Sequence, residues 1–206
     1  MKMIFATGNE GKMREVRMIM EGTGIEVVSM KEAGIKIDIV EDGTTFEANA
    51  LIKARAVANA AGIPAMADDS GLEVDAMNKE PGVYSARFLG EDTSYVIKNQ
   101  YIMDRLKDVP DEQRTCRYAC SIATAFPKGT SAVNEEAHEY TAFATLEGKI
   151  AYEAAGENGF GYDPIFFLPE YGKTDAQIPL EEKNKIGHRG KALRAMVEKL
   201  KEAGEI

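Results

Sequence analysis

Residues 1–20 read MKMIFATGNEGKMREVRMIM, and this stretch sets the class of the fold. The apolar run at residues 1–6 predicts a short buried strand, because it is bounded at once by a turn. Apolar side chains then recur at helical spacing, at Met13, Val16, Ile19 and Met20. A strand, a tight turn and a helix therefore open the chain, which indicates an α/β protein.

Periodicity in the rest of the chain predicts further helices and a pair of long strands. Thr44 and Glu47 form a capping-box pattern that begins a second, Ala-rich helix, and Gly62 closes it. Alternating apolar residues at 116–126 and 140–146 predict antiparallel strands, with residues 127–136 as the hairpin loop between them. A last helix carries an apolar stripe at Leu193, Met196, Val197 and Leu200. We expect a mixed central sheet with flanking helices.

Composition predicts one globular domain over residues 1–206, since 44% of residues are hydrophobic and 29% are charged. No run approaches the roughly 20 apolar residues of a membrane span, and the first residues are too short for a signal-peptide core. We expect a soluble cytoplasmic protein with no membrane partner. Cys116 and Cys120 share one strand face and are expected to be buried hydrophobes, neither disulfide-bonded nor metal-binding.

The chain has a formal net charge of -9, yet residues 183–197 contain five basic residues and no carboxylate. Concentrated cations in an acidic protein indicate a small bound anion, such as a nucleotide phosphate chain, and argue against a nucleic-acid partner. A solvated cationic helix is the alternative. Within this stretch His188 and Arg189 begin the last helix, where positive charge opposes the helix dipole unless an anion or a hydrogen-bonding base lies beside them.

Three further segments carry residues suited to nucleotide chemistry. Residues 7–12, TGNEGK, join the first strand to its helix and are typical of a phosphate loop, although an ordinary Gly/Asn turn has similar residues. Asp68 and Asp69 follow a short apolar run and are placed at a strand end, where Mg²⁺ shared with Glu41 would offset their charge; a polar turn is the alternative. Residues 159–163, GFGYD, offer a ring on which a base can stack, or a bulged strand with core aromatics.

Together these segments resemble the inosine triphosphate pyrophosphatase family, hydrolases of non-canonical purine nucleoside triphosphates. The resemblance covers nearly the whole chain. It rests on ATGNEGK at 6–12, EDGTTFEANALIKA at 41–54, ADDSGLEVDA at 67–76, PGVYSARF at 81–88, GFGYDPIFF at 159–167 and EEKNKIGHRGKAL at 181–193. It implies a mixed α/β fold with two lobes around a long sheet, a substrate cleft between them, and a homodimer.

The resemblance also implies roles for individual residues. Glu41 and Asp69 would bind Mg²⁺, and Asp69 would also be the proton acceptor. Substrate would contact Thr7, Gly8, Asn9, Glu10, Gly11, Lys12, Ser70, Phe160, Gly161, Tyr162, Asp163, Lys183, His188 and Arg189. One departure is visible, because Gly187 stands where many members have Ser before the His-Arg pair, and its missing hydroxyl is expected to loosen that turn.

The implied reaction is Mg²⁺-dependent hydrolysis of ITP, dITP and XTP to the monophosphate and pyrophosphate, which keeps deaminated purines out of DNA and RNA. Water activated by Asp69 would attack the α-phosphorus, while Lys12 and Lys183 would favour the leaving pyrophosphate. Donors at the base site would pair with a 6-keto purine and leave adenine unpaired. The alternatives are a non-catalytic nucleotide sensor and a pyrophosphatase of modified pyrimidine nucleotides.

Overall fold

The computed structural model describes residues 1–206, which form two compact units. The first unit comprises Met1–Asp69, Cys120–Ala144 and Arg189–Ile206, and the second comprises Ser70–Ala119 and Thr145–His188. The strands β3 (Ala65–Val74), β4 (Thr115–Phe126) and β5 (His138–Ile150) contribute residues to both units. The strand order is β2-β1-β3-β4-β5-β6-β7, with parallel and antiparallel neighbours. The expected α/β class with a mixed sheet is confirmed.

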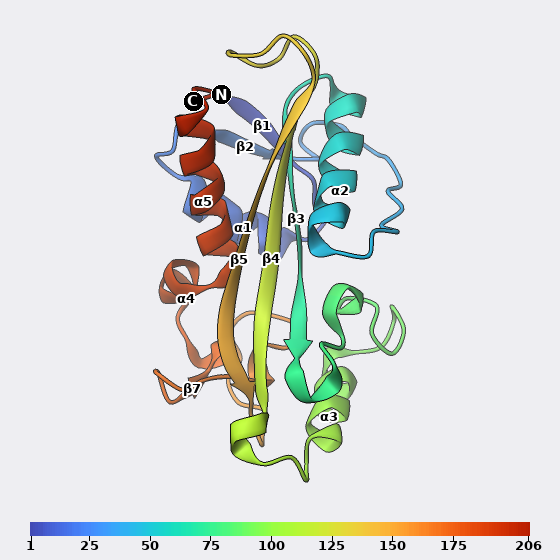
Figure 1. Cartoon of the computed structure of the whole chain (residues 1–206), viewed down its shortest axis with the longest axis vertical. Helices are drawn as coiled ribbons and strands as arrows, with labels where there is room; N and C mark the ends of the chain where they lie inside the picture. The colour runs from blue at the N-terminus through green and yellow to red at the C-terminus, as the bar shows by residue number, and fades with distance from the viewer. The chain divides into compact units, whose positions relative to one another are not determined.

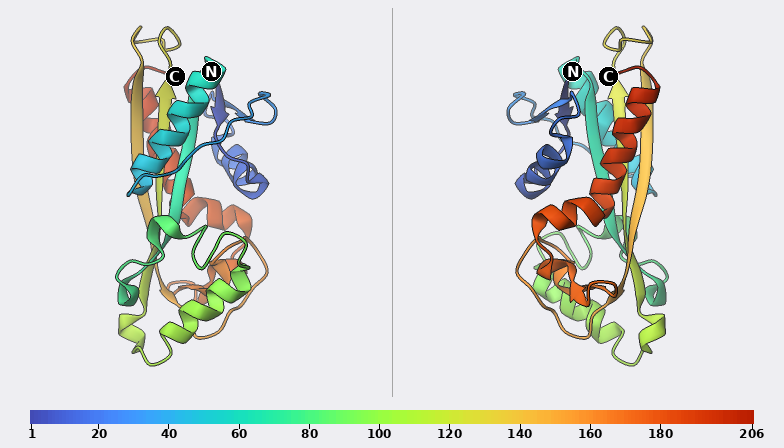
Figure 2. Two further views of the ribbon diagram at one scale, coloured as in Figure 1. Left: turned by 90° about the vertical axis from the view of Figure 1, so that its right-hand side faces the viewer. Right: turned by 90° about the vertical axis from the view of Figure 1, so that its left-hand side faces the viewer.

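The first unit has helices on both faces of its part of the sheet (Figures 1 and 2). In it β1 (Lys2–Phe5) pairs in parallel with β2 (Glu26–Ser29) and with β3. The helices α1 (Glu10–Met20) and α5 (His188–Glu202) cover one face, and α2 (Phe46–Ala61) covers the other. Alternate strand residues divide between these two cores because successive side chains of a strand point to opposite faces.

The α2 helix packs closely against the sheet because its buried stripe is made of small residues, including Ala50, Ala54 and Ala58. Its N-cap is Thr45, whose side chain accepts a hydrogen bond from the backbone N–H of Ala48. The N-cap expected at Thr44 was therefore wrong by one residue, and the expected capping box was wrong too, because Ala48 and not Glu47 stands three residues after Thr45. At the other end Gly62 adopts a left-handed conformation with φ 68°, and the helix stops there as expected.

The second unit is built on the strand order β3-β4-β5-β6-β7, in which β5, β6 (Phe166–Leu168) and β7 (Lys173–Thr174) are antiparallel neighbours. Its helices are α3 (Tyr95–Arg105) and α4 (Leu180–Ile186). Its short 3-10 helices are Asp75–Met77, Gly82–Tyr84, Asp111–Gln113, Asp163–Ile165 and Asp175–Gln177. A separate apolar core fills this unit, so each unit has a core of its own.

Strand β3 continues without a break through the two adjacent aspartates. The expected strand end at this point was wrong, because Leu72 and Val74 are buried and hold the chain extended beyond the polar residues. The hairpin loop expected after the first long strand is confirmed between β4 and β5. Cys116 and Cys120 are buried and not disulfide-bonded, as expected. None of the helices combines the length and the apolar character that crossing a membrane requires.

Candidate functional site

The loop between β1 and α1 is built as a helix cap. The side chain of Asn9 accepts a hydrogen bond from Lys12 N at 3.1 Å, and Thr7 Oγ1 accepts one from Asn9 N at 3.1 Å. Gly8 and Glu10 are exposed, and Gly11 is half-buried. The first turn of α1 therefore begins at the solvent-facing end of a buried strand, where its N–H groups are positioned for an anion.

Asp68 is the centre of a buried ion-pair network in the first unit. Its Oδ2 lies 2.8 Å from Lys12 Nζ and 3.1 Å from Arg189 Nε. The guanidinium of Arg189 also forms an ion pair with Glu15, which projects from α1. Burial by itself would raise the pKa of Asp68, but the charges of Lys12 and Arg189 outweigh it and lower that pKa far below its usual range. Arg189 thereby fixes Asp68, and with it Lys12.

Asp69 belongs to a second network in the same unit. Its Oδ1 lies 2.9 Å from Lys53 Nζ, which also lies 2.6 Å from Glu41 Oε2. Asn49 Nδ2 donates to Asp69 Oδ2 at 3.3 Å. Burial raises the pKa of Asp69 above its usual value even though the charge of Lys53 opposes this. A carboxylate that binds a proton more readily than usual is suited to accept one.

The two adjacent aspartates act separately because they are consecutive in a strand. Their side chains point to opposite faces of the sheet, so Asp68 meets α1 and α5 whereas Asp69 meets α2. The sequence suggested that the two carboxylates share one cation. In the structure only Asp69 shares a cation with Glu41, and that cation is the Lys53 ammonium.

The donor set around Lys53 fits a hard divalent cation. Two carboxylates, Glu41 and Asp69, converge on the single positive charge of the Lys53 ammonium. Mg²⁺ is usually bound by one or two carboxylates, with water and substrate phosphates completing its coordination. The chain has no group of three or more His, Cys, Asp or Glu side chains that could hold a metal by itself. Water and substrate oxygens would therefore complete the coordination of a metal held here by Glu41 and Asp69.

In the second unit, Asp163 organises the glycine- and aromatic-rich segment. It accepts hydrogen bonds from Tyr118 Oη at 2.8 Å and from the backbone N of Phe160 at 2.8 Å, and it forms an ion pair with Lys183. Gly159 has φ 77°, and a Cβ there would lie 2.1 Å from Asp163 Oδ2. Only glycine fits this position without displacing the carboxylate.

The glycine- and aromatic-rich segment 159–163 contains one exposed ring and one packed ring. Phe160 is 39% exposed, and Lys183 Nζ lies 5.5 Å from its ring centroid. Tyr162 is buried and donates to the backbone oxygen of Ser85, as expected for a core aromatic. His188 stacks with Tyr118 at 4.7 Å between ring centroids. Phe160 is therefore the ring in this segment that a base can reach.

The turn before the His-Arg pair is closed. Gly187 N donates to Lys183 O at 2.8 Å, and a Cβ at Gly187 would lie 2.6 Å from that oxygen. The missing side chain lets the backbone approach closely, and the expected loosening of this turn stays a prediction.

Residues 3–199 match the model of the Ham1 family. The chain belongs to the Ham1 family. It is 46% identical over 198 residues to the dITP/XTP pyrophosphatase of Desulforamulus reducens, covering 96% of this chain and 94% of the relative. It is 44% identical to the dITP/XTP pyrophosphatase of Thermus thermophilus, over 98% of this chain and 93% of the relative. The solved structure of a HAM1 protein from Coxiella burnetii superposes with a TM-score of 0.85 at 36% identity, and the match covers 98% of this chain and 99% of that chain.

Several residues of these Ham1 networks were not identified from the sequence. Lys53 lies inside the 41–54 motif, and a lysine in an Ala-rich helical segment beside the carboxylates of that motif was an available signal. Tyr118 could have been found as an aromatic residue in a strand of small side chains. Glu15 and Asp175 gave no signal, because an acidic residue in a helix or loop is ordinarily exposed.

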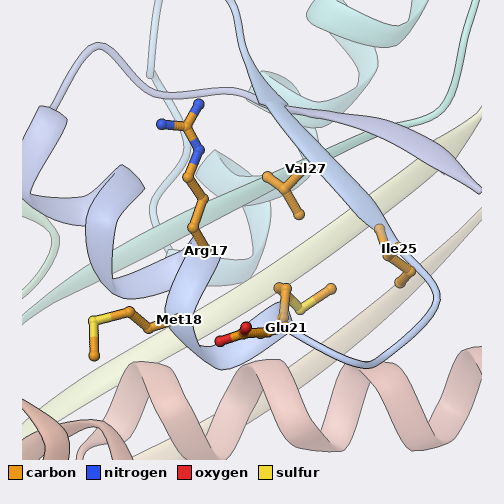
Figure 3. A pocket seen from close by; sticks show the side chains of 6 residues that line it. Arg17, Met18, Glu21, Ile25 and Val27 are labelled. Carbon is orange, nitrogen blue, oxygen red and sulfur yellow. The ribbon is translucent and has the colours of Figure 1, made fainter.

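An open pocket of about 340 Å³ lies elsewhere in the first unit of this Ham1 chain, between α1 and β2 (Figure 3). It is lined by Arg17, Met18, Met20, Glu21, Ile25 and Val27. None of the predicted site residues lines it. Arg17 is paired with Glu32, and the pocket has none of the paired carboxylates found around Asp69.

Proposed function

We propose that this Ham1 chain hydrolyses the non-canonical purine nucleoside triphosphates ITP, dITP and XTP to the monophosphate and pyrophosphate, with Mg²⁺ as cofactor. Its relatives at 44–46% identity over nearly the whole chain are named dITP/XTP pyrophosphatases, and the chain is a nucleoside triphosphate pyrophosphatase of the same kind. The reaction would remove deaminated purines from the nucleotide pool.

The observation that carries the proposal is the convergence of Glu41 and Asp69 on Lys53. Two hard oxygen donors that already hold one cation provide the ligands that a Mg²⁺–triphosphate needs. When bound there, Mg²⁺ would neutralise charge that develops on the phosphate oxygens. Lys53 would then exchange part of its contact with the carboxylates for the phosphate chain.

The remaining steps belong to side chains of the first unit. Asp69 would orient the attacking water and accept its proton, consistent with a pKa that burial raises. Water would attack the α-phosphorus, and the bond from that phosphorus to the bridging oxygen would break. Lys12 and the N–H groups of residues 7–12 would stabilise the leaving pyrophosphate. Asp68 and Arg189 would position Lys12 for this task.

Base recognition would fall to the second unit. A purine stacked on Phe160 would present its 6-keto oxygen to donors such as Lys183 and His188, while Asp163 would accept from its ring N–H. Adenine would present an amino group to the same donors and leave them unpaired, which is costly in a buried site. Ser70, Gly161 and Tyr162 would shape the pocket.

Location and assembly complete the proposal. We place the protein in the cytoplasm, where nucleotide pools are maintained, acting as a homodimer without nucleic-acid or membrane partners. Exposed apolar side chains on and near α3, including Val96 at 79% and Ile97 at 58%, offer a surface for self-association. Light scattering during size-exclusion chromatography checks the dimer, and a single-chain mass of 22.5 kDa would contradict it.

Product analysis tests the reaction. The purified protein is incubated with Mg²⁺ and, separately, with inosine, xanthosine, adenosine and guanosine triphosphates, and the products are separated by chromatography. Monophosphate and pyrophosphate from the first two substrates alone are expected. Diphosphate and orthophosphate would move cleavage to the β–γ bond and refute the mechanism, whereas tight binding without turnover would favour a nucleotide sensor.

A pair of variants tests the metal ligands. Glu41→Gln keeps the size of the side chain but removes the charge, so the Mg²⁺ concentration for half-maximal rate should rise by about tenfold or more. The neighbouring Asp42 is exposed, and Asp42→Asn is the matched control that should behave as the native protein. Equal Mg²⁺ requirements in the two variants would remove Glu41 from the metal site.

A further inference from the structure

A buried carboxylate, Asp175, lies beside Lys183 and outside the six motifs that carry the family resemblance. It begins the 3-10 helix Asp175–Gln177, and 1% of its surface is exposed. Its Oδ2 lies 3.1 Å from Lys183 Nζ, and its two oxygens have no further hydrogen-bond donor. A buried ionised carboxylate with a single shared cation beside it is costly, so its presence next to Lys183 calls for a functional reason.

Lys183 is shared between two carboxylates with different surroundings. Asp163 accepts hydrogen bonds from Tyr118 and from a backbone N–H in addition to its pair with Lys183, so its negative charge is well stabilised. The charged and titratable groups that face Asp175 are Lys183 on α4, Asp163 on its 3-10 helix and Tyr118 on β4. With both carboxylates ionised, the trio of Asp163, Asp175 and Lys183 carries one net negative charge.

The charge of this trio changes near neutral pH. Burial raises the pKa of Asp175 to about 7, and the nearby Asp163 raises it while Lys183 opposes the rise. Below that pH the trio is neutral, because Asp175 holds a proton. Above it the trio is an anion enclosed in protein, where charge acts more strongly than in water.

A base stacked on Phe160 would lie within range of this charge. Of the two rings in segment 159–163, Phe160 is the exposed one, and Lys183 Nζ is 5.5 Å from its centroid. The hypoxanthine base of ITP is neutral around neutral pH. The xanthine base of XTP is more acidic and loses a ring proton there, so it would meet a negatively charged trio as an anion.

We propose that Asp175 determines specificity by placing a second carboxylate beside Lys183, which makes the site favour the neutral hypoxanthine base over the ionised xanthine base. The proposal rests on the proposed function, because it assumes that the base is recognised beside Phe160 and Lys183. It assigns a preference within the proposed substrate class to a residue outside the shared motifs.

The test measures kcat/KM for ITP and for XTP between about pH 6 and pH 9, with the native protein and with the Asp175→Asn variant. The native ratio of kcat/KM for XTP to that for ITP should fall by about tenfold as the pH rises through about 7. In Asp175→Asn the ratio should stay level. Glu170→Gln, which changes an exposed carboxylate of the same unit, is the matched control and should keep the native profile.

Each result decides the matter. A native ratio that does not vary with pH would overturn the proposal even where Asp175→Asn does not fold. If a folded Asp175→Asn protein loses kcat/KM equally for ITP and XTP, the proposal is also overturned, because that pattern indicates a purely structural role for Asp175. Affinities for inosine and xanthosine monophosphates, measured by calorimetry over the same pH range, separate the two proposals: a pH-dependent preference without turnover supports Asp175 and refutes the hydrolase.

Discussion

The adjacent aspartates of β3 allow stability and activity to be separated by two single substitutions. Asp68→Asn removes the negative charge that makes the hydrogen bonds from Lys12 and Arg189 charge-assisted, at a side chain that is 1% exposed. Each such bond contributes about 1.5–3 kcal/mol, and breaking a buried ion pair typically costs about 3–5 kcal/mol. We expect the free energy of unfolding to fall by about 3–5 kcal/mol.

Asp69→Asn should behave differently, although it changes the next residue in the same way. Lys53 keeps its contact with Glu41 at 2.6 Å, and the fold already disfavours the ionised form of Asp69 by burial. We expect a loss of about 1 kcal/mol in stability. Turnover should fall by about 10²-fold or more, because Asp69 is the proton acceptor and a metal ligand in the proposed mechanism.

Urea unfolding followed by circular dichroism measures the first effect, and pyrophosphate release measures the second. Because the folded pKa of Asp68 is lowered, its stabilisation is present above the unfolded value near 3.8 and is lost as the pH falls toward the folded value. The gap between native and Asp68→Asn should therefore narrow in acid. A loss in Asp68→Asn no larger than that in Asp69→Asn would refute the assignment of the two networks.

Three other predictions concern glycine, arginine and histidine positions. Gly159→Ala should raise KM and should lower the melting temperature by more than Gly62→Ala does. Both glycines have positive φ, but only at Gly159 would the new Cβ lie 2.1 Å from a carboxylate oxygen. Equal shifts in melting temperature for the two variants would contradict this. Arg114→Lys should cost about 2–3 kcal/mol in urea unfolding, because the buried guanidinium donates to three backbone carbonyls that one ammonium cannot all reach. Burial lowers the pKa of His138, but its hydrogen bonds, including one to Glu205, outweigh burial and raise that pKa overall. His138→Gln should therefore lower the free energy of unfolding by about 1 kcal/mol below about pH 6 and by less above about pH 9, where the native imidazole is uncharged. Urea unfolding at both pH values checks this.

Local features of the fold were readable from the sequence because short-range geometry controls them. The helix end at Gly62 follows from the conformational freedom of glycine, and the division of strand residues between two cores follows from the two-residue period. Errors occurred where a choice depended on packing. Thr44 and Thr45 are chemically equal caps, so residue type alone could not decide between them, and the structure has Thr45.

The motifs predicted the residue types of the site but not their partners. That Asp68 and Asp69 face different helices depends on β3 continuing through them, which buried residues further along the strand enforce. The pairing of Lys53 with Glu41 and Asp69 brings together three segments through the packing of α2.

The sequence by itself determined the α/β class, the opening strand and helix, the long hairpin, the last helix, and the motifs by which the chain resembles a nucleotide hydrolase family, because periodicity and residue chemistry are local properties. Only the tertiary structure decided which carboxylates are stabilised by buried cations and which are available to a metal, and it alone placed Asp175 beside Lys183. The reason is physical: the ionisation and affinity of a group depend on burial and on charges a few ångströms away, and those neighbours come from distant parts of the chain.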